Sequence, residues 1–111
     1  MPDNIKKDDI IENLHRTMIG YEFNLRGIST KITIRLDKIR KTGKVAFSQS
    51  HFIHAPKQMG PYMTDHSWGY DEQEALNSAL GGYRRFYKMA VDAGHKPNDS
   101  WLVLNTTFKW F

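Results

Sequence analysis

The sequence predicts an α+β fold: an antiparallel sheet of four or five strands with two helices packed on one face, in the order α-β-β-β-(β)-α-β. Three observations favour this fold. Apolar residues recur with the period of a helix over residues 4–19 and again over 72–93. Between these segments apolar and polar residues alternate with the period of a strand. Short turns join the alternating segments, which favours antiparallel pairing, and helices with one apolar face are expected to cover the sheet.

The first helix is expected over residues 4–19, because four apolar side chains there share one helical face. They are Ile10, Ile11, Leu14 and Met18. Alternation then predicts three strands, which cover residues 21–26, residues 31–37 and a segment that begins at Val45. Phe52 has the wrong parity to share a face with Phe47, which predicts a bulge near Gln49–Ser50. A short strand is expected over Tyr62–His66.

The second helix has the clearest boundaries. Asp71 is a good N-cap, and Glu74, three residues later, completes a capping box. Gly94 ends the helix, and a final strand is expected over Trp101–Phe108. The pair Gly81-Gly82 costs about 1 kcal/mol per residue inside a helix, which indicates a kink or the close approach of another element.

Two short likenesses accompany this pattern. The element order is similar to that of double-stranded-RNA-binding domains, which start their second helix with lysines, whereas residues 71–74 here read Asp-Glu-Gln-Glu. The segment Gly69–Leu76 resembles the start of a helix in small antitoxins of the HicB type, and no separate DNA-binding segment follows it. The first likeness is one of element order, and the second covers eight residues.

Length and composition suit one domain, 1–111, with a substantial core, since 40% of the residues are hydrophobic and 13% aromatic. The absence of cysteine excludes disulfides, thiolate metal sites and thiol nucleophiles, and fits a reducing compartment. No apolar run approaches the ~20 residues that span a bilayer, and the N-terminus lacks the apolar centre of a signal peptide. We therefore expect a cytoplasmic protein that does not enter membranes.

Positive charge is concentrated in Arg26–Lys44, a predicted hairpin with seven basic residues and one acid, Asp37, for a net charge of +6. The rest of the chain carries −2, so this segment exceeds the protein's whole net charge of +4. Flexible cations on a projecting ribbon suit phosphates, while lysines on exposed strands also discourage aggregation. The leading prediction is a non-enzymatic interaction module that meets an acidic protein or a nucleic-acid backbone. The predicted binding residues are Lys31, Arg35, Lys38, Arg40, Lys41, Lys44, Arg84, Arg85 and Lys88.

A second hypothesis is a small-molecule site or enzyme between the sheet and the second helix. Its aromatic pocket would be lined by His66, Trp68, Tyr70, Tyr83 and Tyr87. None of the common nucleotide, zinc-protease, serine-nucleophile or calcium motifs occurs, and no metal or cofactor is expected.

The chain ends in Phe108-Lys109-Trp110-Phe111. Leaving such rings in water forfeits the free energy of burying them, so this tail is expected to fold back or to dock on another subunit. A homodimer formed through the last strand is the predicted assembly.

Overall fold

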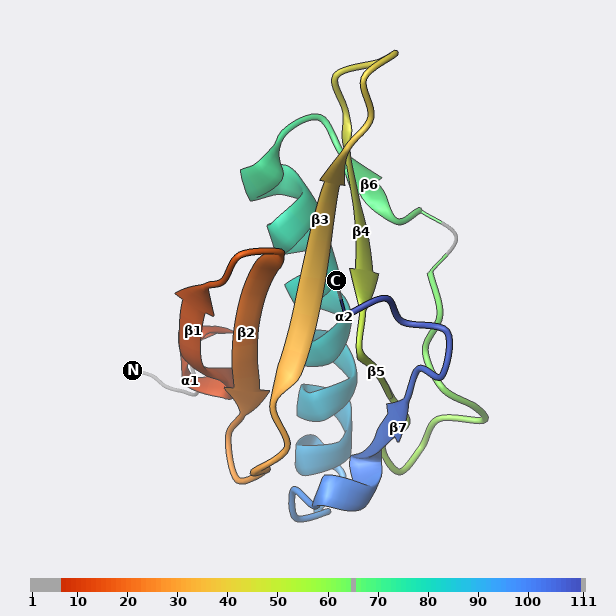
Figure 1. The fold of residues 1–111 in the computed structure, drawn as a ribbon. Helices are drawn as coiled ribbons and strands as arrows, with labels where there is room; N and C mark the ends of the chain where they lie inside the picture. Colours follow the sequence, from red (N-terminus) through yellow and green to blue (C-terminus); the bar gives the residue numbers. More distant parts are fainter. Residues whose placement is uncertain (1–6, 65, 111) are drawn as a thin grey trace.

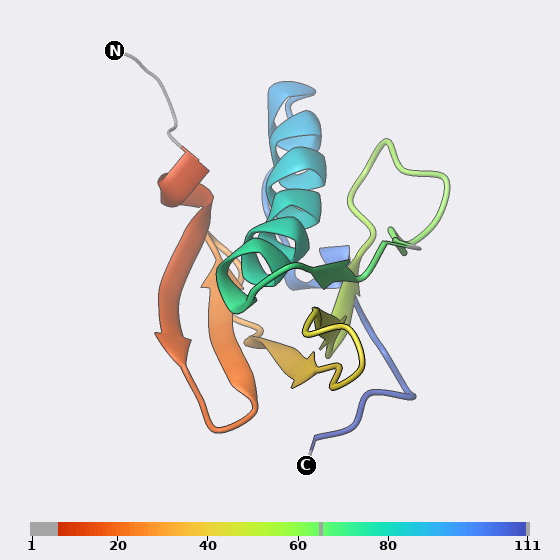
Figure 2. The same ribbon diagram turned by 90° about the horizontal axis from the view of Figure 1, so that it is seen from above.

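The computed structural model describes residues 7–64 and 66–110, and its centre is a five-stranded antiparallel sheet (Figure 1). The strands lie in the order β1 (Ile11–Arg16), β2 (Gly20–Leu25), β3 (Ile32–Lys38), β4 (Val45–Gln49) and β6 (Trp68–Gly69). The long helix α2 (Glu72–Asp92) covers one face of this sheet, as the view from above shows (Figure 2). The predicted α+β fold with an antiparallel sheet is confirmed.

The first predicted helix is wrong, so one long helix covers the sheet in place of two. Only α1 (Lys7–Ile10) is helical, β1 follows directly, and residues 4–6 lie outside the described part. Ile10 and Ile11 are buried, but Leu14 and Met18 are 41% and 100% exposed. The expected helical face therefore has no core to cover beyond its first turn. Residues 11–16 instead pair with β2, because the hydrogen bonds of the sheet stabilise them more than the short apolar pattern stabilises a helix.

The core lies between α2 and the sheet. In the antiparallel pairing of β2 with β3, Phe23 lies opposite Ile32 and Tyr21 lies opposite Ile34. This register places the apolar side chains of both strands on the face that α2 covers. The helix contributes its own apolar stripe, and the Tyr83 ring meets Phe23 edge-on at 5.3 Å. The buried side of α2 consists of Ala75, Leu76, Ala79, Leu80, Tyr83, Tyr87 and Ala90. Alanines in this stripe let the helix lie close to the strands.

The β4 strand is interrupted at Ser50, where the bulge was predicted. Beyond it, β5 (His51–Ile53) pairs with β7 (Leu102–Leu104) in a separate two-stranded sheet. The Ser50 hydroxyl accepts a hydrogen bond from the Thr33 amide at 2.8 Å, and the Ser50 carbonyl accepts one from the Asn105 amide. Ser50 thus joins β3 to the segment after β7, and its side chain is fully buried.

Two short strands differ from prediction. A strand was expected over Tyr62–His66, but its described residues, 62–64 and 66, form none, and β6 lies later in the chain, at Trp68–Gly69. A Cβ at Gly69 would lie 2.4 Å from the Ala75 backbone nitrogen, so glycine allows the chain to pair with β4 directly beneath α2. The strand expected over Trp101–Phe108 is limited to β7, preceded by the 3₁₀ helix η1 (Asp99–Trp101).

The predicted N-cap of α2 is present, and the Glu74 side chain reaches back one residue beyond the N-cap amide that a capping box would use. The Asp71 side chain accepts a hydrogen bond from the Glu74 amide at 2.8 Å, and Glu74 accepts one from the Tyr70 amide at 2.8 Å. The close approach predicted at the glycine pair occurs at Gly82, where an added Cβ would lie 2.6 Å from the Tyr62 ring. A Cβ at Gly81 would meet open space.

The C-terminal segment folds back across the sheet face opposite α2 (Figure 2). The Arg35 guanidinium donates to the Lys109 carbonyl at 3.1 Å, and the Phe108 ring is buried with Trp110 packed edge-on against it at 4.8 Å. Phe111 lies outside the described residues. No helix in residues 7–64 or 66–110 has the length and apolar content needed to cross a bilayer.

Candidate functional site

The β3–β4 hairpin projects beyond the N-terminal end of α2 and beyond the neighbouring strands (Figure 1). Its tip is ordered by backbone hydrogen bonds from the Ile39 amide to the Lys44 carbonyl at 2.7 Å and from the Gly43 amide to the Ile39 carbonyl at 2.8 Å. Gly43 has φ 73°, a left-handed conformation that glycine adopts without strain. The tip is therefore a defined turn that holds its side chains away from the body.

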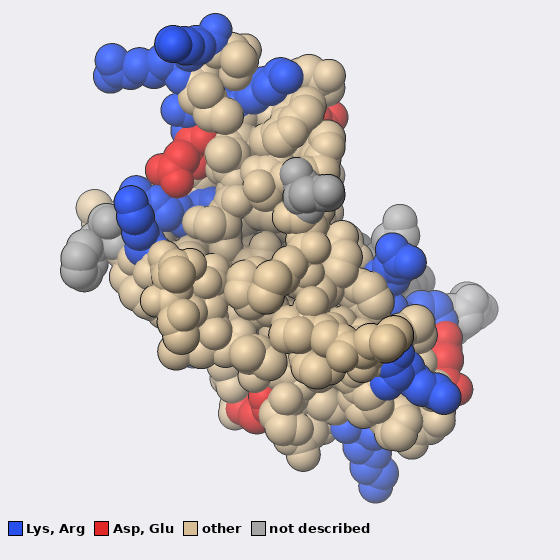
Figure 3. Space-filling view, turned by 90° about the vertical axis from the view of Figure 1, so that its right-hand side faces the viewer, with Lys and Arg blue, Asp and Glu red and all other residues tan. Residues whose placement is uncertain are grey.

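Four of the predicted basic residues come together at this tip: Lys38, Arg40, Lys41 and Lys44. In Figure 3, blue side chains gather at the projecting end of the molecule. Lys38, Arg40 and Lys41 are exposed, and none of the carboxylates in the described part of the chain forms an ion pair with them. These three charges are therefore available to an outside anion.

Lys44, in contrast, makes cation–π contacts with aromatic rings in β6 and directly after it. Its ammonium lies over the Trp68 ring at 4.1 Å and 5.6 Å from the centre of the Tyr70 ring. His66 stacks on Trp68 at 4.4 Å, and Tyr70 meets Trp68 edge-on at 5.2 Å. We call His66, Trp68 and Tyr70 the aromatic ladder. It occupies every second residue along the chain, which is the period of side chains on one face of a strand.

Strand pairing brings the aromatic ladder to the basic tip. Ala46 pairs with Trp68, and Val45 pairs with Gly69 on the side where Gly69 contacts α2. Alternation therefore puts Lys44 and Trp68 together on the opposite face. The local sequence patterns did not predict this neighbourhood. The alternation of His66, Trp68 and Tyr70 with small residues indicates one aromatic face, but it does not indicate that this face lies beside Lys44.

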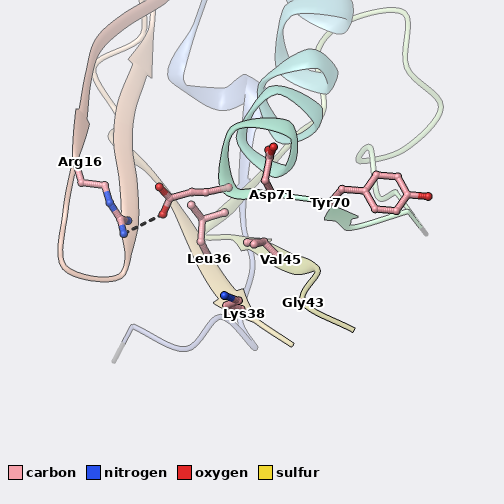
Figure 4. Close-up of a pocket in the computed structure, with 8 residues that line it drawn as sticks. Arg16, Leu36, Lys38, Gly43, Val45, Tyr70 and Asp71 are labelled. Atoms are coloured by element: carbon pink, nitrogen blue, oxygen red, sulfur yellow. Dashed lines mark ion pairs between the residues drawn. The ribbon is translucent and has the colours of Figure 1, made fainter. Parts of the chain in front are cut away.

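A cleft of about 540 Å³ lies between the hairpin and the start of α2 (Figure 4). Leu36 and Val45 supply apolar walls, and Arg16 reaches Glu72 in an ion pair of 3.0 Å. The Tyr70 ring points away from this cleft. The Asp71 carboxylate already accepts a hydrogen bond from the Glu74 amide, and Glu72 and Glu74 add negative charge to the first turn, so the helix start does not attract an anion here.

The other predicted basic residues lie elsewhere. Lys31 precedes β3 and Lys38 ends it, so the two are about 23 Å apart at ~3.3 Å per strand residue. Arg35 is paired with Asp37 at 3.0 Å. Arg84, Arg85 and Lys88 are on α2, and Lys88 is paired with Asp92 at 3.0 Å. The nine predicted residues therefore do not form one surface.

The five residues of the predicted aromatic pocket also separate into two groups. Tyr83 and Tyr87 are buried in the core, and their hydroxyls donate to the carbonyls of His51 and Arg26. Burial raises the pKa of both phenols, so they stay protonated. The aromatic ladder lies on the other side of β6, so the structure does not bring the five rings to a shared cavity.

The neighbouring polar side chains of Ser50 and His51 have structural partners. The Ser50 hydroxyl and His51 Nδ1 are 2.8 Å apart, but the serine is fully buried, which prevents it from reaching a substrate. Burial also lowers the pKa of His51. Among the described side chains, no three potential metal ligands are grouped closely enough to hold an ion.

The chain was compared with protein-family models, with curated proteins and with solved structures, and none of them matches it. A function for this chain must therefore be argued from the geometry of its own residues.

Proposed function

We propose that this protein is a non-enzymatic binding module whose β3–β4 tip meets a polyanion, in particular a nucleic-acid backbone. The observation that carries the proposal is the group of exposed cations at Lys38, Arg40 and Lys41, which lack a carboxylate partner among the described residues. Placing like charges together on a projecting turn costs repulsion, and an anionic partner relieves it. Each phosphate that the tip neutralises also releases condensed counterions.

The proposal predicts a limited salt dependence. With up to four phosphate contacts, log K should fall with log salt at a slope of roughly −3 for a single strand. The test is a fluorescence anisotropy titration of labelled single-stranded DNA, duplex DNA and polyglutamate at two ionic strengths. Binding that weakens with salt is expected. If none of the three polymers binds at low salt, the proposal is wrong.

Matched variants assign the binding to the tip. Lys41→Ala should reduce the salt slope by about 0.7 for a single strand, because one phosphate contact is lost. Lys96→Ala removes the same charge from the exposed loop at the other end of α2, which makes it the control. Equal losses for the two variants would indicate attraction by net charge alone and would contradict a site at the tip.

We further propose self-association through the apolar surface beside β7. Leu104 and Trp110 are 55% and 49% exposed, and β7 has a strand partner, β5, on one side. An open strand edge flanked by apolar side chains favours pairing of two copies about a two-fold axis. Sedimentation of the wild type and of Leu104→Glu tests this, since a dimer should dissociate in the variant. A wild type that stays monomeric at high concentration would exclude it.

A further inference from the structure

The aromatic ladder offers ring surface beside the basic tip. Tyr70 is 67% exposed and His66 is exposed, while Trp68 is partly covered by its contacts with His66 and Lys44. Trp68 therefore supports His66 and Tyr70, and these two side chains are the accessible rings of the aromatic ladder. The cross-strand neighbour of Trp68 is Ala46, whose small side chain leaves space on this face.

The Lys44 ammonium connects the two features. It lies within cation–π distance of Trp68 and Tyr70, so it sits at the boundary between the aromatic ladder and the free cations of the tip. A phosphate attached to a nucleotide stacked on Tyr70 would be within reach of this ammonium. The tip and the ladder are therefore placed to act on the same ligand.

Two polyanion classes lack the groups that would use these rings. A duplex keeps its bases stacked and paired inside the helix, and polyglutamate carries no aromatic groups. A single strand presents unpaired bases, and every base has a face that can stack on an aromatic ring. Exposed rings beside phosphate-binding cations are the combination that proteins use for single strands.

We propose that the aromatic ladder stacks unpaired bases while the tip cations hold the adjacent phosphates, so that the ligand is a single-stranded nucleic acid. This inference rests on the proposed function of the tip. Recognition would be tolerant of sequence, because stacking reads the face of a base and leaves its hydrogen-bonding edge free.

The test compares two ligands of equal charge. One is labelled oligo(dT) of about 12 nucleotides, the scale of sites in small single-strand-binding domains. The other is an abasic oligonucleotide of the same length, which has the phosphates but no bases. The wild type should bind oligo(dT) about 5- to 150-fold more tightly, the range that corresponds to stacking of one base.

Variants of Tyr70 separate stacking from charge. Tyr70→Ala should weaken oligo(dT) binding at least about 5-fold, while its salt slope and its binding to the abasic strand stay unchanged. Tyr70→Phe keeps the ring and should retain the affinity for oligo(dT). Because this side chain is mostly exposed, neither change should affect folding, which thermal unfolding checks.

The outcomes distinguish the inference from the proposed function. If Lys41→Ala weakens binding but oligo(dT) and the abasic strand bind equally, the tip binds phosphate and the stacking inference is wrong. Tighter binding of duplex than of oligo(dT) would overturn the inference in the same way. Absence of binding to every strand at low salt would overturn both.

Discussion

Alanine substitution at the neighbouring residues Gly81 and Gly82 should change the stability of this protein in opposite directions. Both glycines lie inside α2, where alanine restricts the unfolded chain and favours the helix. The two positions differ in what a new methyl group would meet. At Gly81 it would meet open space, whereas at Gly82 it would lie 2.6 Å and 2.9 Å from two carbons of the Tyr62 ring.

The magnitudes follow from this geometry. Gly81→Ala should stabilise the protein by about 0.5–1 kcal/mol, the difference in helix propensity. Gly82→Ala has the same favourable effect on helix propensity, but the new methyl group forces the Tyr62 ring away, at an overpacking cost of about 1–3 kcal/mol. We therefore expect this variant to have an unfolding free energy about 1 kcal/mol below that of the wild type. The ring has little freedom, because the Tyr62 amide donates to the Ile53 carbonyl and the ring packs on Phe86 at 4.9 Å.

Urea unfolding measures both free energies. The two variants should differ by about 1.5–2 kcal/mol in unfolding free energy, which separates their midpoints by roughly 0.75–1 M at an unchanged slope of about 2 kcal/mol per M. Combining Gly82→Ala with Tyr62→Ala provides the control, since removal of the ring should make the alanine at position 82 stabilising. Equal effects of the two single substitutions would refute the close contact between the loop and α2.

Three further predictions concern caps and titrating groups. Asp71→Ala should lower the unfolding free energy by about 0.5–2 kcal/mol, and Asp71→Asn, which also caps, should lower it less in the same urea assay. Burial lowers the pKa of folded His51 below its ordinary 6.5, so its contribution to stability is complete above pH 6.5 and is lost as the pH falls through the lowered value. Thermal unfolding across that range should show this loss, and His51→Gln should reduce it. Hydrogen bonds from Thr30 and Ser29 lower the pKa of Asp99 from 3.8, so stability should also decrease as the pH falls below 3.8. Asp99→Asn should remove that second decrease; an unchanged acid profile would contradict the role of this carboxylate.

Local patterns predicted the elements that carry strong periodicity. The alternation that predicted strands over 21–26 and 31–37 corresponds to β2 and β3, and the N-cap predicted at Asp71 begins α2. The helix expected over residues 4–19 does not continue beyond Ile10, because Leu14 and Met18 have no core to pack against. Residues 11–16 pair with β2 instead, with a bulge where Asn13 has φ 59°.

The candidate site could be predicted only in part. The concentration of lysine and arginine around residues 38–44 is visible in the chain, and so are the aromatic residues near 66–70. Their contact is not visible, because more than twenty residues separate Lys44 from Trp68 and no local signal pairs the two segments.

Local sequence is enough to predict where the charge collects, which segments alternate and where the long helix begins, because these properties depend on residues close together in the chain. It does not predict that residues 11–16 become an edge strand or that β6 pairs with β4. Such choices depend on which distant backbone groups find hydrogen-bond partners and which side chains the packed core accepts. The neighbourhood of basic tip and aromatic ladder follows from that pairing.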